Sequence, residues 1–227
     1  DWVSLARVIA KDRTGKDQSS KISGAAADAA RDYGSNFGWG ICHYPRGNLL
    51  LVNVPVSSTQ YDQHVLNTTT GAWCRFTGMN GSSWATYDDM LYFGGMGGVV
   101  YKADTGTNDN TANIAAELQT AWNHLGYQQP KMMVGFRPVI EATGALTLSF
   151  GIGFDFKEVV VSQTVSSVAA GSPWDTSPWD TSPWSPEANV RTEQYDASGE
   201  GTDMSLRLRY LGKGQDVSLF RWDYWFL

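Results

Sequence analysis

Short apolar runs that end in turns follow one another at intervals of roughly ten residues through the first half of this chain. They are NLLLVNVPV (48–56), QYDQHVLN (60–67), AWCRFTG (72–78), SSWATY (82–87), MLYFGG (90–95) and GVVYKAD (98–104). Such even spacing is typical of an antiparallel sandwich, a barrel or a propeller blade. The composition agrees, because the chain has 24 glycines, which suit turns, and 13% aromatic residues, which favour strands. The sequence therefore predicts a mainly β fold.

Two of the connecting segments predict tight hairpins. TTTG (68–71) is a Thr/Gly turn between two of the apolar runs. GGMGG (94–98) separates two more, and no Gly-Lys-Ser/Thr follows it, so it lacks the sequence of a phosphate-binding loop.

The strands lengthen in the second half. The segments are KMMVGFRPVIEA (131–142), ALTLSFGIGFDFKEVVVSQTV (145–165), TDMSLRLRYLG (202–212) and DVSLFRWDYWFL (216–227). Apolar and polar residues alternate along them, which indicates half-buried antiparallel strands. In the last segment the alternation predicts one apolar face made of Phe220, Trp222, Tyr224 and Phe226. We expect a second β unit that is an antiparallel sheet or a sandwich.

Only two stretches suggest a helix. GAAADAARDY (24–33) is rich in alanine and is followed by Gly34, a common helix stop. Segment 108–125 fits either a helical stripe or the alternation of a strand, and propensity alone favours the helix. The predicted organisation is an arm with a short helix (1–37), a propeller-blade-like β region (38–107) and a long-stranded antiparallel β unit (108–227).

Charge, apolar run length and cysteine content argue against several classes of protein. The net charge of −6 is poorly suited to gripping a phosphate backbone, which Lys and Arg hold. No run of about 18 apolar residues is present to span a membrane. Cys42 and Cys74 are the only cysteines, too few for a disulfide framework, and we expect two buried free thiols.

One motif raises the question of catalysis. ADTG (103–106) follows an apolar run, as the catalytic loops of aspartic proteases do, but that chemistry needs two carboxylates from two such loops and only one is present. A turn that ends a strand explains Asp104 and Gly106 equally well. The three histidines do not have the spacing of a zinc site. The sequence predicts no catalytic, metal-binding or cofactor-binding residues.

A Trp/Pro repeat occupies residues 172–188, SPWDTSPWDTSPWSPEA, and places Trp174, Trp179 and Trp184 at even spacing. Proline restricts the residue before it to extended conformations, so the repeat predicts an extended arm that displays three rings. The rings could form a platform for sugars or a receptor, or pack on strands of this chain or of a neighbouring subunit. We favour packing, because soluble proteins avoid large exposed apolar patches. The short period excludes a WD40 repeat, which has about forty residues.

Three segments together resemble tail proteins of short-tailed bacteriophages, the packaged-DNA stabilisation or tail hub and nozzle proteins. They are GWGICHYPRGNLLLVNVPV (38–56), the stretch 64–106, and WDTSPW with SLRLRYLGKGQDVSLFRWDYWF. Asn67, Thr70, Gly71, Ala72 and Trp73 match the hairpin pattern of that family. Tyr92, Phe93, Gly94, Gly98, Tyr101, Asp104 and Gly106 match the pattern of the next blade. These are fold motifs and bring no catalytic residues with them.

The resemblance implies a virion structural protein that is not an enzyme and that is assembled in the host cytoplasm. It would form a homo-oligomeric ring, a hexamer in the family, and contact portal, adaptor and other tail proteins. Double-stranded DNA would pass through the ring without specific binding, and no membrane or cofactor would take part. A propeller has four to eight blades, whereas residues 38–106 hold only one or two. The resemblance also favours a strand over residues 112–122, against the helix propensity of that segment.

Two alternatives remain open from the sequence. One is a carbohydrate- or receptor-binding β module that uses Trp174, Trp179 and Trp184. The other is an enzyme resembling the aspartic proteases, with Asp104 as its acid.

Overall fold

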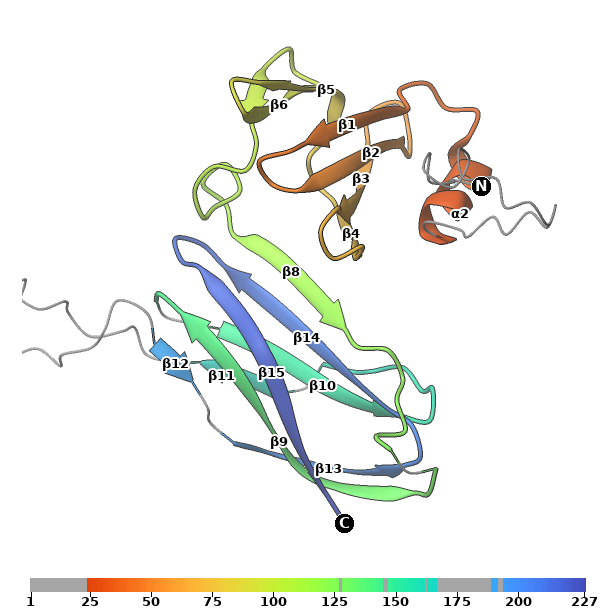
Figure 1. Cartoon of the computed structure of the whole chain (residues 1–227), viewed down its shortest axis with the longest axis vertical. Coiled ribbons are helices and arrows are strands. Elements are labelled where there is room, and N and C mark those ends of the chain that lie inside the picture. The colour runs from red at the N-terminus through yellow and green to blue at the C-terminus, as the bar shows by residue number, and fades with distance from the viewer. Residues whose placement is uncertain (1–23, 127, 145–146, 162, 167–188, 192–193) are drawn as a thin grey trace, which may run out of the picture. The chain divides into compact units, whose positions relative to one another are not determined.

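The chain is mainly β, with one short helix near the start of its described part (Figure 1). The computed structural model describes residues 24–126, 128–144, 147–161, 163–166, 189–191 and 194–227. All strand pairs within it are antiparallel and form four sheets. The chain divides into two compact units, Asp1–Thr105 and Gly106–Leu227.

In its described part, residues 24–105, the first unit contains one helix and two antiparallel meanders. The elements are α2 (Gly24–Tyr33), β1 (Gly40–Tyr44), β2 (Leu49–Pro55), β3 (Tyr61–Asn67), β4 (Trp73–Phe76), β5 (Gly81–Tyr87), β6 (Met90–Gly95) and β7 (Val100–Lys102). Strands β1 to β4 are neighbours in sequence order, and so are β5 to β7. Each strand of these two sheets therefore pairs antiparallel with the next strand in the sequence, in agreement with the predicted mainly β fold.

These elements of the first unit form three layers. On one face of the β1–β4 sheet, Val52 and Val54 pack against Ala29 of helix α2. On its other face, Leu51 and Val65 form a core with Leu91 of the β5–β7 sheet. Residues 51, 52 and 54 illustrate the rule that successive side chains of a strand point to opposite faces. The β1–β4 sheet is therefore covered by a helix on one side and by the second sheet on the other.

The turns of the first unit follow from local chemistry. The Asn67 side-chain oxygen accepts hydrogen bonds from the backbone N–H groups of Thr69 and Thr70, at 2.9 and 3.0 Å, and closes the predicted hairpin. Asp88 and Asp89 both have positive φ, 48° and 56°, as a two-residue type I′ hairpin requires. GGMGG forms the predicted tight turn, in which Gly95 N–H donates to the Val99 carbonyl at 2.8 Å.

The second unit is a sandwich of two antiparallel sheets (Figure 1). Its strands are β8 (Ile114–Gln119), β9 (Lys131–Ala142), β10 (Thr147–Phe154), β11 (Gln163–Ser166), β12 (Asn189–Arg191), β13 (Tyr195–Gly201), β14 (Met204–Gly212) and β15 (Val217–Phe226). One sheet has the order β11-β10-β14-β8. In the other, the long strand β9 pairs with β12 and β13, and also with β15.

The core of the sandwich lies between these two sheets. Phe136 of β9 and Phe150 of β10 meet edge to face, with ring centroids 4.4 Å apart. Met204 and Leu206 of β14 join them, and a second cluster at Ile140 extends the core along β9. This second unit is the antiparallel sheet or sandwich that the alternating segments predict.

The structure settles the ambiguous segment and confirms the helix. Residues 24–33 form helix α2 as predicted, and residues 114–119 form strand β8 rather than the helix that propensity favoured. Pairing with β14 explains this result, because a ladder of hydrogen bonds overrides a weak local preference.

Two details of the predicted strands are wrong. Segment 145–165 is not one strand, because Asp155 and Phe156 adopt positive φ (51° and 62°) and the chain turns back so that β11 pairs with β10. In the last strand, a bulge between Leu219 and Arg221 inserts an extra residue and shifts the alternation. Phe220 is consequently 58% exposed instead of lying on the core face with Trp222.

The cysteines are free, but only Cys42 is buried. Cys74 is exposed, contrary to the prediction of two buried thiols. It lies on β4 at the edge of its sheet, where no further strand of the described residues covers it.

Candidate functional site

The Trp/Pro repeat, residues 172–188, lies outside the described residues, so the burial expected for Trp174, Trp179 and Trp184 is not tested. The segment that contains it connects β11 to β12. The chain therefore leaves one sheet of the sandwich and enters the other through the repeat.

Asp104 lies in the turn that follows β7, with a positive φ of 54°. Its carboxylate accepts a hydrogen bond of 2.9 Å from the hydroxyl of Tyr44, a side chain only 1% exposed. The hydroxyl of Thr105 donates to the Lys102 carbonyl at 3.3 Å in the same turn. The Asp-Thr-Gly segment thus fastens the end of the second meander to a buried tyrosine of the first.

The surroundings of Asp104 indicate a structural role. Burial, together with the hydrogen bond to Asp104, raises the pKa of the Tyr44 hydroxyl, which therefore stays protonated and continues to donate. No hydrogen bond joins Asp104 to a second carboxylate among the described residues, as a shared-proton pair would require. Those residues also contain no group of three or more His, Cys, Asp or Glu side chains that could hold a metal.

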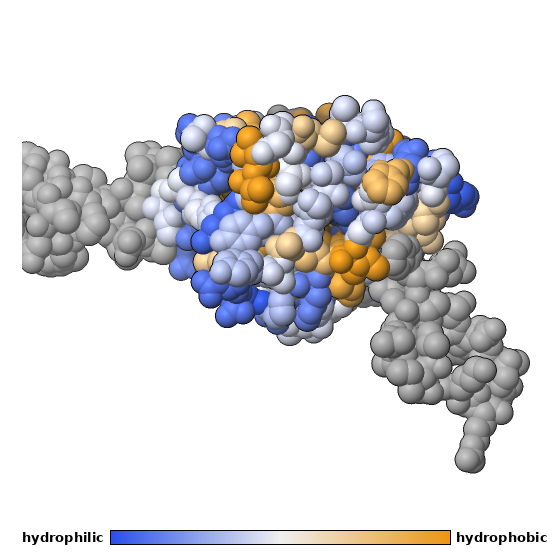
Figure 2. Space-filling model, turned by 90° about the horizontal axis from the view of Figure 1, so that it is seen from above, coloured by the Kyte–Doolittle hydropathy of each residue, from blue (hydrophilic) through white to orange (hydrophobic). Residues whose placement is uncertain are grey.

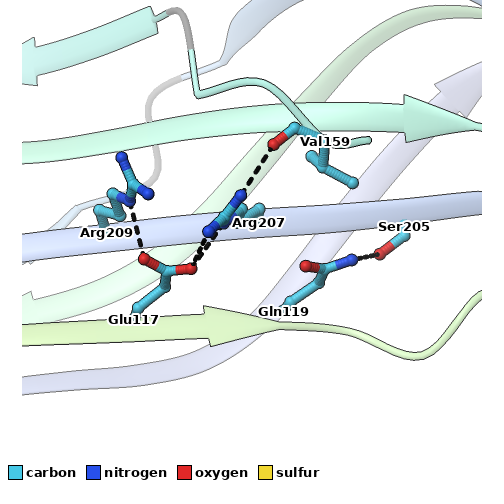
Figure 3. Close-up of polar contacts among 6 residues, drawn as sticks. All are labelled: Glu117, Gln119, Val159, Ser205, Arg207 and Arg209. Carbon is cyan, nitrogen blue, oxygen red and sulfur yellow. Dashed lines mark hydrogen bonds and ion pairs between the residues drawn. The ribbon is translucent and has the colours of Figure 1, made fainter. Parts of the chain in front are cut away.

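A charged cluster in the second unit joins β8 to β14 (Figure 3). Glu117 accepts hydrogen bonds from Arg207 and Arg209, at 2.6 Å to Arg207 Nε and 2.8 Å to Arg209 Nε. Arg207 also donates to the Val159 carbonyl at 3.2 Å. Glu117 and Arg209 lie directly opposite each other in the strand register, which explains why one carboxylate reaches both guanidinium groups.

This cluster orders the sheet and is poorly suited to proton transfer. The hydrogen bonds from Arg209 and Arg207 lower the pKa of Glu117, so the carboxylate stays ionised and is a weak base. Its side chain is 42% exposed, so water screens the ion pairs and each stabilises the fold only modestly. Two cations against one anion leave a local charge of about +1 on this face.

A second set of hydrogen bonds extends the attachment of β8 to β14. Gln119 donates to the Ser205 hydroxyl at 3.3 Å (Figure 3). That hydroxyl in turn donates to the Thr120 carbonyl at 2.8 Å. The backbone N–H of Leu206 donates to the Thr120 hydroxyl at 3.0 Å. Side chains as well as the backbone ladder therefore fix the position of β8 beside β14.

Sequence reasoning missed a polar group inside the first unit. Asn53 on β2 accepts hydrogen bonds through its side-chain oxygen from Gln63 on β3, at 2.9 Å, and from the Trp84 indole on β5, at 3.0 Å. Asn53 and Gln63 are 2% and 0% exposed. The sequence offered one signal for this group: Asn53 and Gln63 stand within the apolar runs NLLLVNVPV and QYDQHVLN. Amides buried in strands need hydrogen-bond partners, so these two side chains could have been expected to bond. The bond from Trp84 joins the second meander to the first, and the bond from Gln63 holds the Asn53 side chain in place for it.

A shallow hollow of about 330 Å³ lies beside β14 in the second unit. Its lining includes the apolar side chains of Leu125, Ile152 and Leu206 and the ring of Tyr224. Among its polar lining groups, the Ser205 hydroxyl already donates to the Thr120 carbonyl, and the Thr120 hydroxyl already accepts from the Leu206 N–H. Nothing in its chemistry selects a particular ligand.

Exposed apolar side chains are scattered in the view of Figure 2, where separate orange spots lie among blue and white residues. Those of the first unit concentrate on the second meander, with Tyr87 76% and Val100 71% exposed. Those of the second unit include Ile114 and Leu118 on β8. Both meander and strand therefore offer apolar contact surface to other molecules.

Comparison with known proteins does not assign the chain to a family. No family model matches it, and no curated protein matches it significantly. Within the residues that the structure describes, no helix is long and apolar enough to cross a membrane.

Proposed function

We propose that this protein is a structural subunit of a short-tailed bacteriophage tail, a component of the hub or nozzle through which the packaged DNA leaves. It acts by shape, as one copy in a homo-oligomer, and it performs no catalysis. Double-stranded DNA passes the assembly without being gripped, since the chain has 23 acidic against 17 basic residues.

The observation that carries this proposal is the face-to-face packing of two successive meanders. The β1–β4 and β5–β7 sheets share the core around Leu51 and Leu91, as neighbouring propeller blades do. Two residues of the motifs that resemble the phage family, Asn67 and Gly98, lie at turns of these meanders, and others, such as Tyr92, lie on their strands. The resemblance therefore concerns residues that have a defined role in the local fold.

The outer faces of the two meanders differ, and the difference supports assembly. Helix α2 covers the outer face of the first, where Ala29 packs on Val52. The outer face of the second carries Tyr87 and Val100, both largely exposed. A sheet face that a helix covers cannot pack against another sheet. The open apolar face of the second meander, in contrast, is suited to contact with a neighbouring subunit.

Particle formation tests the proposal. The protein is produced together with the tail and portal proteins encoded beside its gene, and the product is viewed by negative-stain microscopy. We expect ring-like particles, and we expect the protein in purified virions by mass spectrometry. Absence from the virion, or the absence of any ring, contradicts the proposal.

A matched pair of variants locates the contact. Tyr87→Glu together with Val100→Glu places charge on the open face and should prevent rings while the circular dichroism spectrum stays unchanged. Val160→Glu changes an equally exposed valine, 67% exposed, in the second unit and should leave rings intact. Binding to a glycan array by the wild-type protein, without rings, would favour the carbohydrate-binding alternative.

A further inference from the structure

Strand β8 is an edge strand whose outer side has no partner among the described residues (Figure 1). The backbone N–H of Thr120 donates to the Leu206 carbonyl at 2.9 Å, so the backbone groups of even-numbered residues point toward β14. Those of the odd-numbered residues 115, 117 and 119 point away from it, because the direction alternates along a strand. The open side of β8 thus presents a row of free donors and acceptors.

Proteins usually protect such an edge, and β8 lacks the usual protection. Proline, lysine or an unpaired charge on an edge strand discourages pairing with another chain. The sequence IAAELQ contains neither proline nor lysine, and its single charge, Glu117, is held by Arg207 and Arg209. The strand is therefore competent to pair with another strand.

The face of β8 that continues the core side of the sheet is apolar and uncovered. Leu118 lies opposite Leu208, and Ile114 lies opposite Gly212, on the face that in β14 belongs to the core. Ile114 is nevertheless 39% and Leu118 44% exposed, and no residue of β8 belongs to the core clusters of the sandwich. The opposite sheet stops short of β8, so this apolar strip is available to a partner.

We propose that β8 pairs antiparallel with β8 of a second copy of the chain, about a two-fold axis at Ala116, and so joins two sheets into one. In this register Ile114 of each copy lies opposite Leu118 of the other. Residue 115 of each copy lies opposite residue 117 of the other, and these two exchange both of their backbone hydrogen bonds. The four resulting bonds use only groups that point away from β14.

The self-complementary sequence selects this register over its neighbours. A shift that centres the axis on Glu117 would set the two Glu117 side chains directly opposite, which like charges oppose. A shift that centres it on Ala115 would set Ile114 opposite Ala116 and leave Leu118 beyond the paired segment. With the axis at Ala116, Ile114 and Leu118 of both copies are all buried in the contact.

This inference goes beyond the proposed function and does not depend on it. A two-fold contact joins copies in pairs and cannot by itself close a cyclic ring, which needs head-to-tail contacts. The edge of β8 and the open face of the second meander are therefore separate surfaces, and each can fail without the other.

Amide hydrogen exchange of the wild-type full chain provides the first test. The amides of Ala115 and Glu117 should exchange fast at low protein concentration and become protected as concentration rises. The amides of Ala116 and Leu118 should be protected at every concentration, because they bond within the sheet. Fast exchange at Ala115 and Glu117 at the highest attainable concentration would overturn the proposal.

Variants separate pairing from folding. Ala115→Pro removes a backbone N–H that only a partner uses and should weaken self-association at least tenfold, measured by sedimentation velocity, while leaving the sandwich folded. Leu118→Lys should have the same effect through the apolar strip. Val160→Lys, an exposed valine outside β8, is the matched control and should associate like the wild type. Equal association of all four proteins would show that β8 is not the contact.

Cross-linking tests the register itself. In a background with Cys74→Ser, which removes the exposed native thiol, Ala116→Cys places two cysteines opposite each other at the axis, within disulfide reach. It should form a covalent dimer on mild oxidation, whereas Gln119→Cys should not. Efficient cross-linking through Gln119→Cys, with none through Ala116→Cys, would exclude the proposed register.

Discussion

At the scale of single residues, the Tyr44–Asp104 hydrogen bond shows how a motif with a catalytic appearance can be structural. Asp104 lies in a strand-ending turn and accepts from a buried hydroxyl that belongs to the other meander. We expect Tyr44→Phe and Asp104→Ala each to lower the urea midpoint of unfolding, and the double variant to cost less than the sum of the two. Additive losses in this double-mutant cycle would mean that the two side chains do not act as a pair.

His64 makes stability depend on pH. It is 8% exposed, and its pKa is lowered first by burial and then by the positive charge of Arg75, against a smaller opposing effect of Asp62. A lowered pKa means that the unfolded chain binds the proton more readily than the folded chain. Stability should therefore be complete above the ordinary histidine pKa of about 6.5 and fall as pH drops below it.

The measurement for His64 is the free energy of unfolding against pH, from pH 7.5 to pH 5. The wild-type curve should fall more steeply below pH 6.5 than that of His64→Gln, which cannot take up a proton. His43→Gln is the control, because His43 is exposed on β1, and it should keep the wild-type slope. Parallel curves for the wild type and His64→Gln would refute this account.

At the scale of elements, glycine decides how strand β10 is covered. The chain turns at Asp155, whose pKa is lowered by hydrogen bonds from the backbone of Asp203 and then of Thr202, and runs back over β10. A Cβ at Gly151 would collide with the carbonyl of Val160. Gly151→Ala should therefore destabilise the protein by about 1–3 kcal/mol, as overpacked sites do.

Chemical denaturation measures this effect, with Gly40→Ala as the control. Gly40 also lies in a strand, but a Cβ there would meet nothing within 4 Å, so the control should be close to neutral. A Gly151→Ala variant as stable as the control would mean that the returning segment does not lie against β10.

The same element shows where sequence reasoning succeeds and where it stops. Periodicity and turn chemistry predicted helix α2, the hairpin turn at residues 68–71 and most of the strands, because these features are local. They did not predict β1, β12 or β13. Sequence reasoning also did not predict the reversal at Asp155 or the bulge at Phe220, because neither residue type requires a positive φ or an inserted residue. Those features are set by bonds to residues far along the chain, such as Asp155 to Thr202 at 2.8 Å.

In the candidate site, too, local features could be predicted from the sequence and long-range contacts could not. The turn role of Asp104 could be stated from the sequence, whereas its partner Tyr44 could not, because sixty residues separate them. The Glu117 cluster was equally hidden, since it forms only once β8 is known to be a strand beside β14.

At the scale of the whole molecule, each compact unit has its own core, and this predicts how the chain unfolds. Leu51 and Leu206 are 1% and 2% exposed and lie in the cores of the first and second unit. Leu206→Ala should destabilise the second unit by about 2–5 kcal/mol, and Leu51→Ala should do the same to the first. Native-state hydrogen exchange can follow the two units separately, because it reports the opening of each strand. We expect Leu206→Ala to speed exchange in β9, β10 and β14 and to leave β2 and β3 unchanged, with the reverse pattern for Leu51→Ala. If either substitution speeds exchange equally in both sets of strands, the chain unfolds as one cooperative body and the two cores do not act independently.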